Sequence, residues 1–402
     1  MPVEFTSDHE IFRDSVKKFI EKEIRPFAET WEIQGRTPRS LWKKCGEMGF
    51  LGISYPDSVG GMGADFLYNY IFAEEMAKCG SPGVATGFAV QTDMATPALA
   101  EHGNPLLIEN FLKPAISGDM ICSIAVTEPG CGSDVAGVQT RAVLDGNDYV
   151  INGQKTFITN GTQADFITLL ARTNDKPGHH CFSLFVVPTK ISGFSVGKVL
   201  RKISHLSSDT AEIVLQDVRV PKNHLIGQEG EGFIYQMEQF QFERLAGMAN
   251  AIGMMKRGYE LTKKYVSMRE TFGKPLVERQ VVQHKLADMY AEIILIETLA
   301  LRCVELAQKK ENFSKLVTVL KLKGAQAKIR VLEECVQLHG GYGLMHEYEV
   351  ARLYRDSKLA GIGGGANEIM LEIIAKMEGL IPKKSSSSLN YAKQVEKSVV
   401  AN

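Results

Sequence analysis

The sequence predicts an α+β protein in which a β-sheet region lies between two helical regions. Apolar residues recur every three or four positions up to about residue 118, form short strand-like runs from about 119 to 221, and return to helical spacing from about 230. The last residues include a serine run, which is typical of a flexible tail. We therefore expect an N-terminal α-helical domain over 1–118, a middle β-domain over 119–228, a C-terminal α-helical domain over 229–380 and a tail over 381–402.

The first helix is expected to begin near Ser7 or Asp8, since either side chain can cap a helix. The middle region contains short β-branched or aromatic runs separated by turn signals such as Asp145-Gly146-Asn147-Asp148. These runs are SIAVTE, YVING, FITLLAR, CFSLFVVP, FSVGKV and AEIVLQDVRV. Each predicts one strand.

Long amphipathic segments predict the C-terminal helices, at 231–268, 279–309, 312–339 and 366–379. Basic residues recur along the third of them and are most simply interpreted as a solvated helix face. These residues are Lys321, Lys323, Lys328 and Arg330.

Composition excludes several classes of protein. The chain has 402 residues and a formal net charge of −1, so nothing in its charge favours nucleic acid or an anionic membrane as partner. The seven cysteines are scattered without a CxxC pair, which favours free thiols in a reducing compartment. No apolar run predicts a membrane span, and the first residues resemble neither a signal peptide nor a presequence. We expect the bacterial cytoplasm, or the mitochondrial matrix for a mature organellar form.

Three glycine-rich loops are candidates for binding a large anionic cofactor, because small residues let a ligand approach the backbone. They are AVTEPGCGSDVAG (125–137), QLHGGYG (337–343) and GGGANE (363–368). Each also has a plain structural interpretation, as a polar turn, a helix C-cap or a helix start. No GxGxxG, GxxxxGK[ST] or GxSxG pattern is present, and the histidines lack metal-ligand spacing.

At these loops the chain resembles the acyl-CoA dehydrogenase family. TEPGCGSD (127–134), KTFITNG (155–161), RETFGKPLVERQ (269–280) and QLHGGYGLMHEYEVARLYRD (337–356) match its motifs in order, and the resemblance covers roughly 5–380. Cys131 departs from the small residue usual at its position. The resemblance implies an FAD enzyme that oxidises an acyl-CoA to a trans-2-enoyl-CoA. It also implies a C-terminal four-helix bundle, a homotetramer, and an electron-transferring flavoprotein as electron acceptor.

Cofactor residues are implied position by position. Thr127, Ser133, Phe157 and Thr159 would line the flavin, with Ser133 also near the thioester. The FAD of a neighbouring subunit would be held by Arg269, Phe272, Gln280, Gln337, Gly340 and Gly341. The adenosine-pyrophosphate half would meet Ala366, Asn367 and Glu368.

The catalytic base is missing from its usual place. Many relatives carry a glutamate at the position of Gly364, whereas the isovaleryl and long-chain branch carries it within an ERL sequence on an earlier helix. Glu243 of FQFERLAGMANAIG (240–253) falls on that second position. Without the resemblance, Glu243 and Arg244 would be interpreted as an exposed helical pair; with it, Glu243 is expected to remove the α-proton, and to have a raised pKa if it is buried.

Substrate residues are implied in the same way. Gln241, Arg244, Gly364 and Gly365 match substrate-contacting positions of the branch with the helix base. Because Gly363 also lacks a side chain, we expect room for a 3-methyl-branched acyl chain, or for a medium or long one. Two alternatives stay open: a flavin oxidase or monooxygenase of the same fold, and a non-catalytic acyl-CoA-binding protein.

Overall fold

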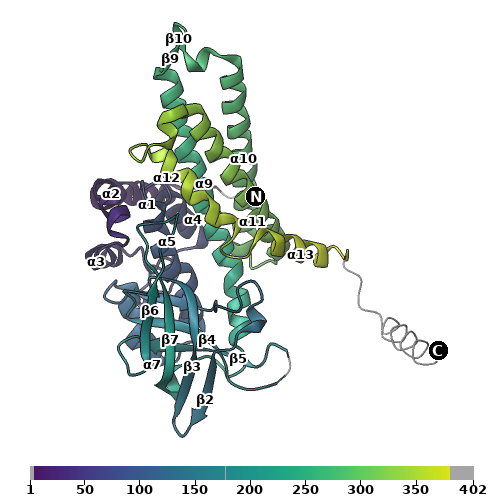
Figure 1. The fold of residues 1–402 in the computed structure, drawn as a ribbon. Coiled ribbons are helices and arrows are strands. Elements are labelled where there is room, and N and C mark those ends of the chain that lie inside the picture. The colour runs from purple at the N-terminus through teal and green to yellow at the C-terminus, as the bar shows by residue number, and fades with distance from the viewer. Residues whose placement is uncertain (1–3, 177, 381–402) are drawn as a thin grey trace, which may run out of the picture.

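The computed structural model describes residues 4–176 and 178–380, and within them the predicted order of helices, strands and helices is confirmed (Figure 1). The sheet lies at one end of the molecule and the ends of the long C-terminal helices lie at the other. The predicted tail, 381–402, lies outside the described residues. In the part of the chain that the structure describes, each helix is too short or too polar to cross a bilayer.

In the N-terminal region, the described residues form eight α-helices and three π-helical turns, one of which is η4 (Val90–Ala95). The expected cap of the first helix is wrong, because Ser7 and Asp8 already lie inside it. Thr6 is the cap: its hydroxyl accepts from the backbone N–H of His9 at 3.4 Å, and its own N–H donates to His9 Nδ1 at 3.0 Å. The helices are α1 (Ser7–Phe19), α2 (Ala28–Gln34), α3 (Arg39–Glu47), α4 (Phe66–Met76), α5 (Pro82–Ala89), α6 (Pro97–His102), α7 (Pro105–Leu107) and α8 (Lys113–Ile116).

The middle region is one sheet in the order β6-β7-β3-β2-β4-β5-β8, with β1 paired in parallel to β4. All six predicted strands are present, and the predicted turn joins β2 to β3, with Asp145 opposite Asp148. The sequence did not predict β2 or β8. The strands are β1 (Cys122–Ala125), β2 (Arg141–Asp145), β3 (Asp148–Thr159), β4 (Phe166–Arg172), β5 (Phe182–Pro188), β6 (Phe194–Val199), β7 (Thr210–Pro221) and β8 (Leu225–Ile226).

The C-terminal helices form a bundle around α11 (Ser314–His339), which packs against α9 (Gly232–Met268), α10 (Gln280–Gln308), α12 (Glu349–Ser357) and α13 (Asn367–Met377). A small hairpin of β9 (Glu270–Thr271) and β10 (Lys274–Pro275) joins α9 to α10.

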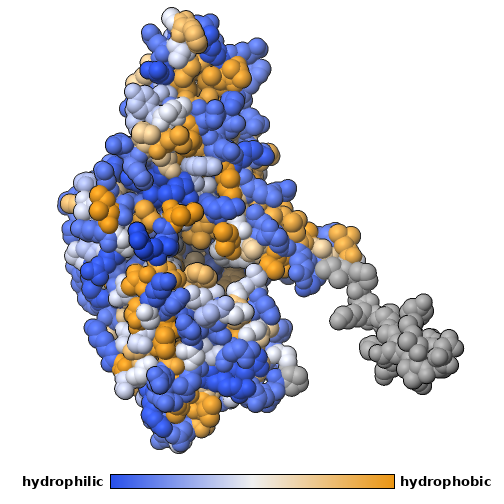
Figure 2. Space-filling view, in the orientation of Figure 1, coloured by the Kyte–Doolittle hydropathy of each residue, from blue (hydrophilic) through white to orange (hydrophobic). Residues whose placement is uncertain are grey.

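Helix α9 contacts the N-terminal helices, the sheet and the other C-terminal helices. Its first residue, Gly232, lies so close to the backbone of β5 that a side chain would clash with it, and Gly253 approaches the backbone of Glu74 on α4 in the same way. Side chains of the N-terminal and C-terminal helices share one hydrophobic core, whereas the sheet packs on two others. On the face shown in Figure 2, the surface is hollowed where the helical and β regions meet.

Candidate active site

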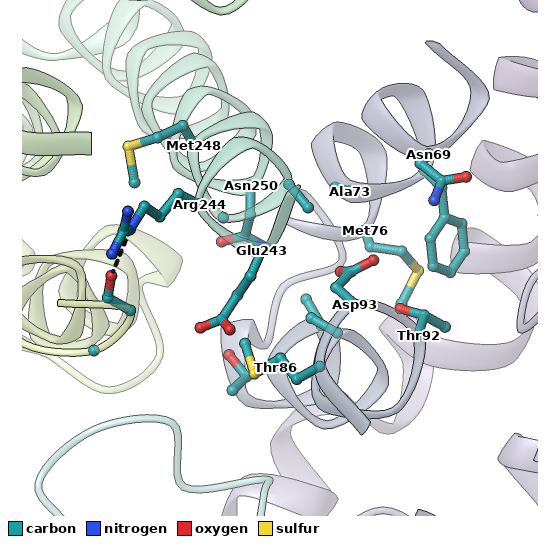
Figure 3. A pocket seen from close by; sticks show the side chains of 18 of the residues that line it. Asn69, Ala73, Met76, Thr86, Thr92, Asp93, Glu243, Arg244, Met248 and Asn250 are labelled. Carbon is teal, nitrogen blue, oxygen red and sulfur yellow. Dashed lines mark hydrogen bonds between the residues drawn. The ribbon is translucent and has the colours of Figure 1, made fainter. Parts of the chain in front are cut away.

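A cavity of about 180 Å³ lies between the N-terminal helices and α9 (Figure 3). One wall comes from α4, α5 and η4, and the other from α9, α11 and the glycine loop before α13. Most of its lining is apolar, and the polar side chains in it come from both walls. The lining includes Phe50, Leu51, Ile53, Phe72, Ala73, Met76, Ala85, Thr86, Thr92, Asp93, Met94, Glu243, Arg244, Asn250, Lys321, Lys328, Gly363 and Gly364.

Glu243 points from α9 into this cavity and is buried, with 8% of its surface exposed. The pKa of its carboxyl is raised to about 7, chiefly by burial; the charge of Asp93 also raises the pKa, while Arg244 and Lys321 lower it. The interpretation of Glu243 as part of an exposed pair is therefore wrong. Its surroundings are those of a carboxyl poised to exchange a proton near neutral pH.

The carbonyls of the glycine loop are held by two cations. Arg244 turns away from Glu243 and donates from Nε to the carbonyl oxygen of Gly364 at 3.2 Å (Figure 3). The ammonium of Lys321 donates to the carbonyl oxygen of Gly365. Burial lowers the pKa of Lys321 to about 8. These contacts fix the loop against α9 and α11.

Gly364 and the carboxylate of Glu243 lie side by side. The backbone of Gly364 is left-handed, with φ of +66°, and a Cβ built on it would lie 3.5 Å from Oε1 of Glu243. The carboxylate thus lies in van der Waals contact with the place where a side chain at position 364 would begin. A glutamate on α9 can therefore place its carboxylate in the same part of the cavity as a glutamate on the loop.

The interpretation of the α11 lysines as a solvated face is half wrong. Lys323 and Arg330 are exposed, but Lys321 and Lys328 are buried, with 2% and 4% of their surfaces exposed. Both buried lysines line the cavity, and burial lowers the pKa of Lys328 to about 8. A helical repeat of lysines does not reveal which of them reach a buried carbonyl or cavity.

A buried ion pair fixes the first glycine loop to the sheet. Lys155, on β3, donates to Glu128 Oε1 at 2.8 Å and to the carbonyl of Val126 at 2.9 Å. Glu128 also accepts the backbone N–H groups of Gln139 and Thr140, at 2.8 and 2.9 Å. Every oxygen of this carboxylate therefore has a donor, and the loop is rigid where it leaves the sheet.

The residues expected to line the flavin lie on or beside this loop. Thr127 and Thr159 are partly exposed and Ser133 is exposed. Phe157 has φ of +59° and 69% of its surface is exposed, so β3 presents an aromatic ring rather than burying it. All seven cysteines are free; six are buried, and Cys131 of the same loop is partly exposed. Exposed hydroxyls and an exposed ring suit a polar aromatic cofactor.

The start of α13 offers a further polar contact. Ala366 precedes the helix, and Asn367 and Glu368 are its first two residues. The side-chain oxygen of Asn367 is buried without a hydrogen-bond partner, as is that of Gln241 on α9. Buried oxygens without a donor fit a bound group that supplies one.

The remaining cofactor residues lie toward the other end of α9. Those within 269–280 belong to the β9–β10 hairpin and the start of α10, which Figure 1 shows at the end away from the sheet, and 337–341 adjoins α9 where the hydroxyl of Tyr265 donates to the carbonyl of His339. Gly340 and Gly341 have open space where a Cβ would stand, and 96% of the surface of Phe272 is exposed. The structure does not bring this group to the cavity. The group consists of Arg269, Phe272, Gln280, Gln337, Gly340 and Gly341.

Several site residues were missed from the sequence. Glu128 lies in the motif TEPGCGSD and Lys155 in KTFITNG. Opposite charges in two motifs that are otherwise mostly small or uncharged are a signal that could have predicted this ion pair. Asp93 lies in a segment of helical period, directly after Gln91 and Thr92, and that period does not indicate that the segment lines a cavity. Only the packing of η4 against α9 and β1 reveals its place.

Comparison with known proteins identifies the family of the chain. Family models of the acyl-CoA dehydrogenase N-terminal, middle and C-terminal domains match residues 6–119, 123–218 and 230–378. The long-chain specific acyl-CoA dehydrogenase of Rattus norvegicus mitochondria is 40% identical over 374 residues, which cover 92% of this chain and 86% of that protein.

Solved structures are similar over almost the whole chain. The acyl-CoA dehydrogenase of Geobacillus kaustophilus aligns with a TM-score of 0.91 at 41% identity, covering 94% of this chain and 99% of that one. A glutaryl-CoA dehydrogenase of Mycobacterium smegmatis, in complex with FADH2, aligns with a TM-score of 0.89 at 28% identity, covering 94% and 96%. The chain therefore belongs to the acyl-CoA dehydrogenase family and is an FAD-dependent oxidoreductase that dehydrogenates acyl-CoA.

Proposed function

We propose that Glu243 is the catalytic base that removes the α-proton of an acyl-CoA, giving the trans-2-enoyl-CoA. The observation that carries the proposal is the position of its carboxylate, in an apolar cavity and beside the place where a side chain at 364 would begin. An α-proton next to a thioester is a weak acid, so the base must be held close to it and partly ionised at working pH. A carboxyl with a pKa of about 7 meets the second condition.

Each protein group beside the reacting carbons has a separate role in the proposed reaction. Ionised Glu243 accepts the α-proton, while the backbone N–H of Gly364 is available to donate to the thioester carbonyl, where negative charge develops. Arg244 and Lys321 hold the carbonyls of the glycine loop, which keeps that N–H in a fixed orientation. When bound, FAD accepts the hydride that leaves the β-carbon.

The cavity beside Glu243 supports a proposal about the acyl chain of the substrate. Gly363 and Gly364 leave two side chains out beside the base, and the remaining lining is largely apolar. We therefore assign a branched acyl chain with a 3-methyl group, or a medium to long one, to this site. Gln241 and Ser133 remain proposed contacts to the substrate.

The cofactor residues support an oligomer. Glu243 and the end of α9 are separated by about 40 Å at 1.5 Å per helical residue. The residues around Phe272 therefore lie too far from the cavity to complete its flavin site, and they are free to serve the FAD of a second copy. This supports an oligomer, for which we propose a homotetramer built as a dimer of dimers. We also propose an electron-transferring flavoprotein as the electron acceptor, on the family resemblance alone.

The test is anaerobic flavin bleaching with a panel of straight and 3-methyl-branched acyl-CoAs. Wild type should bleach with at least one member, whereas FAD-loaded Glu243→Gln should not. Glu238→Gln is the matched control, because Glu238 lies exposed on the same helix and does not line the cavity. Equal bleaching by Glu243→Gln would remove Glu243 from the mechanism.

The alternatives have their own outcomes in this experiment. Rapid reoxidation of the bleached flavin by oxygen, with substrate consumed, would point to an oxidase or monooxygenase. Slow reoxidation in air with fast transfer to an electron-transferring flavoprotein supports the dehydrogenase. A wild type that binds acyl-CoA but bleaches with none would favour a binding protein.

A further inference from the structure

A second carboxyl faces the cavity that holds Glu243. Asp93 lies on η4, on the wall opposite α9, and points into the space between Glu243 and Met76 (Figure 3). The acyl chain of a substrate whose α-carbon meets Glu243 would occupy this space. The base itself needs no second carboxyl, so Asp93 calls for a separate explanation.

Little of the described protein pairs with the carboxyl of Asp93, whose residue is partly exposed. Among the described residues, the only side chain within hydrogen-bonding reach of it is the hydroxyl of Thr92. That hydroxyl has a single proton, and it donates to the backbone carbonyl of Phe88 at 3.1 Å. A polar group left unpaired in an apolar cavity is costly whether it is ionised or neutral.

The turn that carries Asp93 is fixed in place. Gln91 accepts the backbone N–H of Cys122 at 2.9 Å and donates to the carbonyl of Ala115 at 2.8 Å. Gln239 of α9 donates to the carbonyl of Met94, the residue that follows Asp93 in η4. With the turn held at Gln91 and Met94, on either side of Asp93, the carboxyl of Asp93 cannot easily turn out of the cavity. Single π-helical turns of this kind are frequent at functional sites.

A purely hydrocarbon acyl chain would worsen this situation, because it would displace water from Asp93 and offer no donor in return. Burial already raises the pKa of Asp93 to about 7. A hydroxyl or amino group on the chain would supply the missing donor. A carboxylate at the far end of the acyl chain would be repelled by ionised Asp93, because both groups are negatively charged.

We propose that Asp93 forms a polar subsite within the acyl cavity, which selects acyl-CoAs bearing a hydrogen-bond donor on the chain beyond the β-carbon and rejects dicarboxylic acyl-CoAs. This rests on the proposed function, because Glu243 defines which end of the chain reacts. Asn69 and Thr86, two polar side chains of the same wall, would adjoin such a substituent.

The experiment compares chains of one length: octanoyl-CoA, its 5-, 6-, 7- and 8-hydroxy derivatives, and octanedioyl-CoA, with FAD-loaded wild type, Asp93→Ala and Asp93→Asn. The readout is the ratio of kcat/KM for each derivative to that for octanoyl-CoA. A ratio removes the effect of Asp93 on the pKa of Glu243, since all of these substrates react at the same base. The variant Glu238→Gln, which changes an exposed residue of helix α9, again serves as control.

We expect at least one hydroxy derivative to be preferred by about ten- to a hundredfold in wild type, the range for a hydrogen bond to a charged group. Asp93→Ala should bring that ratio close to unity and should improve octanedioyl-CoA relative to octanoyl-CoA. Preference for octanoyl-CoA over all hydroxy derivatives, or ratios unchanged in Asp93→Ala, would overturn the proposal.

Failure of the proposed function is distinguishable from failure of the subsite. If no acyl-CoA bleaches the flavin, the dissociation constants of the same compounds are measured by the shift of the flavin spectrum on binding. A preference for hydroxy derivatives that depends on Asp93 would then support the subsite without Glu243 chemistry. Absence of that preference in binding would refute it.

Discussion

Acidification tests the role of Glu243 directly. A rise in the pKa of its carboxyl from 4.5 to about 7 corresponds to about 3 kcal/mol of differential interaction between the two protonation states. Since only the ionised carboxylate can accept the α-proton, activity should be lost as the pH falls through 7. With this pKa, about nine-tenths of the free enzyme is ionised at pH 8 and about one-tenth at pH 6. We therefore expect kcat/KM to fall about tenfold between these two values.

The assay is stopped-flow bleaching at low acyl-CoA concentration between pH 5 and 9 at constant ionic strength, because kcat/KM reports the groups of the free enzyme. Asp93 titrates in the same range and faces the same cavity, so the two carboxyls give apparent values that belong to the pair. Asp93→Asn removes one negative charge and should move the midpoint to lower pH. A midpoint near 4.5 in wild type, or no change in kcat/KM from pH 8 to pH 6, would refute the reasoning.

Three further predictions concern stability and the glycine loop. Because the folded-state pKa of Glu243 is raised, its charge destabilises the fold above pH 7 and costs nothing well below 4.5; Glu243→Gln should therefore raise Tm at pH 8 but hardly at pH 4. Lys155→Met should leave Glu128 buried without its cation, costing about 3–5 kcal/mol and releasing FAD, measured as Tm and as the flavin to protein ratio. Gly364→Ala should cost about 1 kcal/mol because of its left-handed backbone, and its methyl group beside Oε1 of Glu243 should slow bleaching; unchanged Tm and rate would contradict this.

Much of the fold could be predicted from hydrophobic period. Five of the six predicted strands and the long helices α9, α10 and α11 bury a continuous or periodic apolar surface, which is what the hydrophobic period predicts. Strand β6 is exposed along most of its length, and α13 buries only Met370. Strand β2 was missed because its apolar run is only three residues long, Ala142-Val143-Leu144 between an arginine and an aspartate, and β8 has only two residues. Both segments form strands because they pair with neighbouring strands of the sheet, and a local sequence pattern does not show such pairing.

The candidate site could be predicted only where a motif marked it. The vacancy at Gly364 and the alternative carboxyl at Glu243 are visible in the sequence through the family resemblance, and the structure places them side by side. Lys321 and Asp93 have no such signal, because their importance arises from a contact or a cavity formed by segments far apart along the chain. Helical spacing places a residue on a face of its helix but does not say what that face meets.

The distribution of thiols provides a chemical handle on the cofactor site. Six of the seven cysteines are inaccessible in the folded chain, whereas Cys131 is partly exposed on the loop next to Thr127 and Ser133. A thiol-reactive dye should therefore label the native protein once, at this loop, and label the other six only after unfolding. Such a dye offers a fluorescent probe of cofactor loading and release that requires no substitution, and its stoichiometry counts intact folded chains in a preparation.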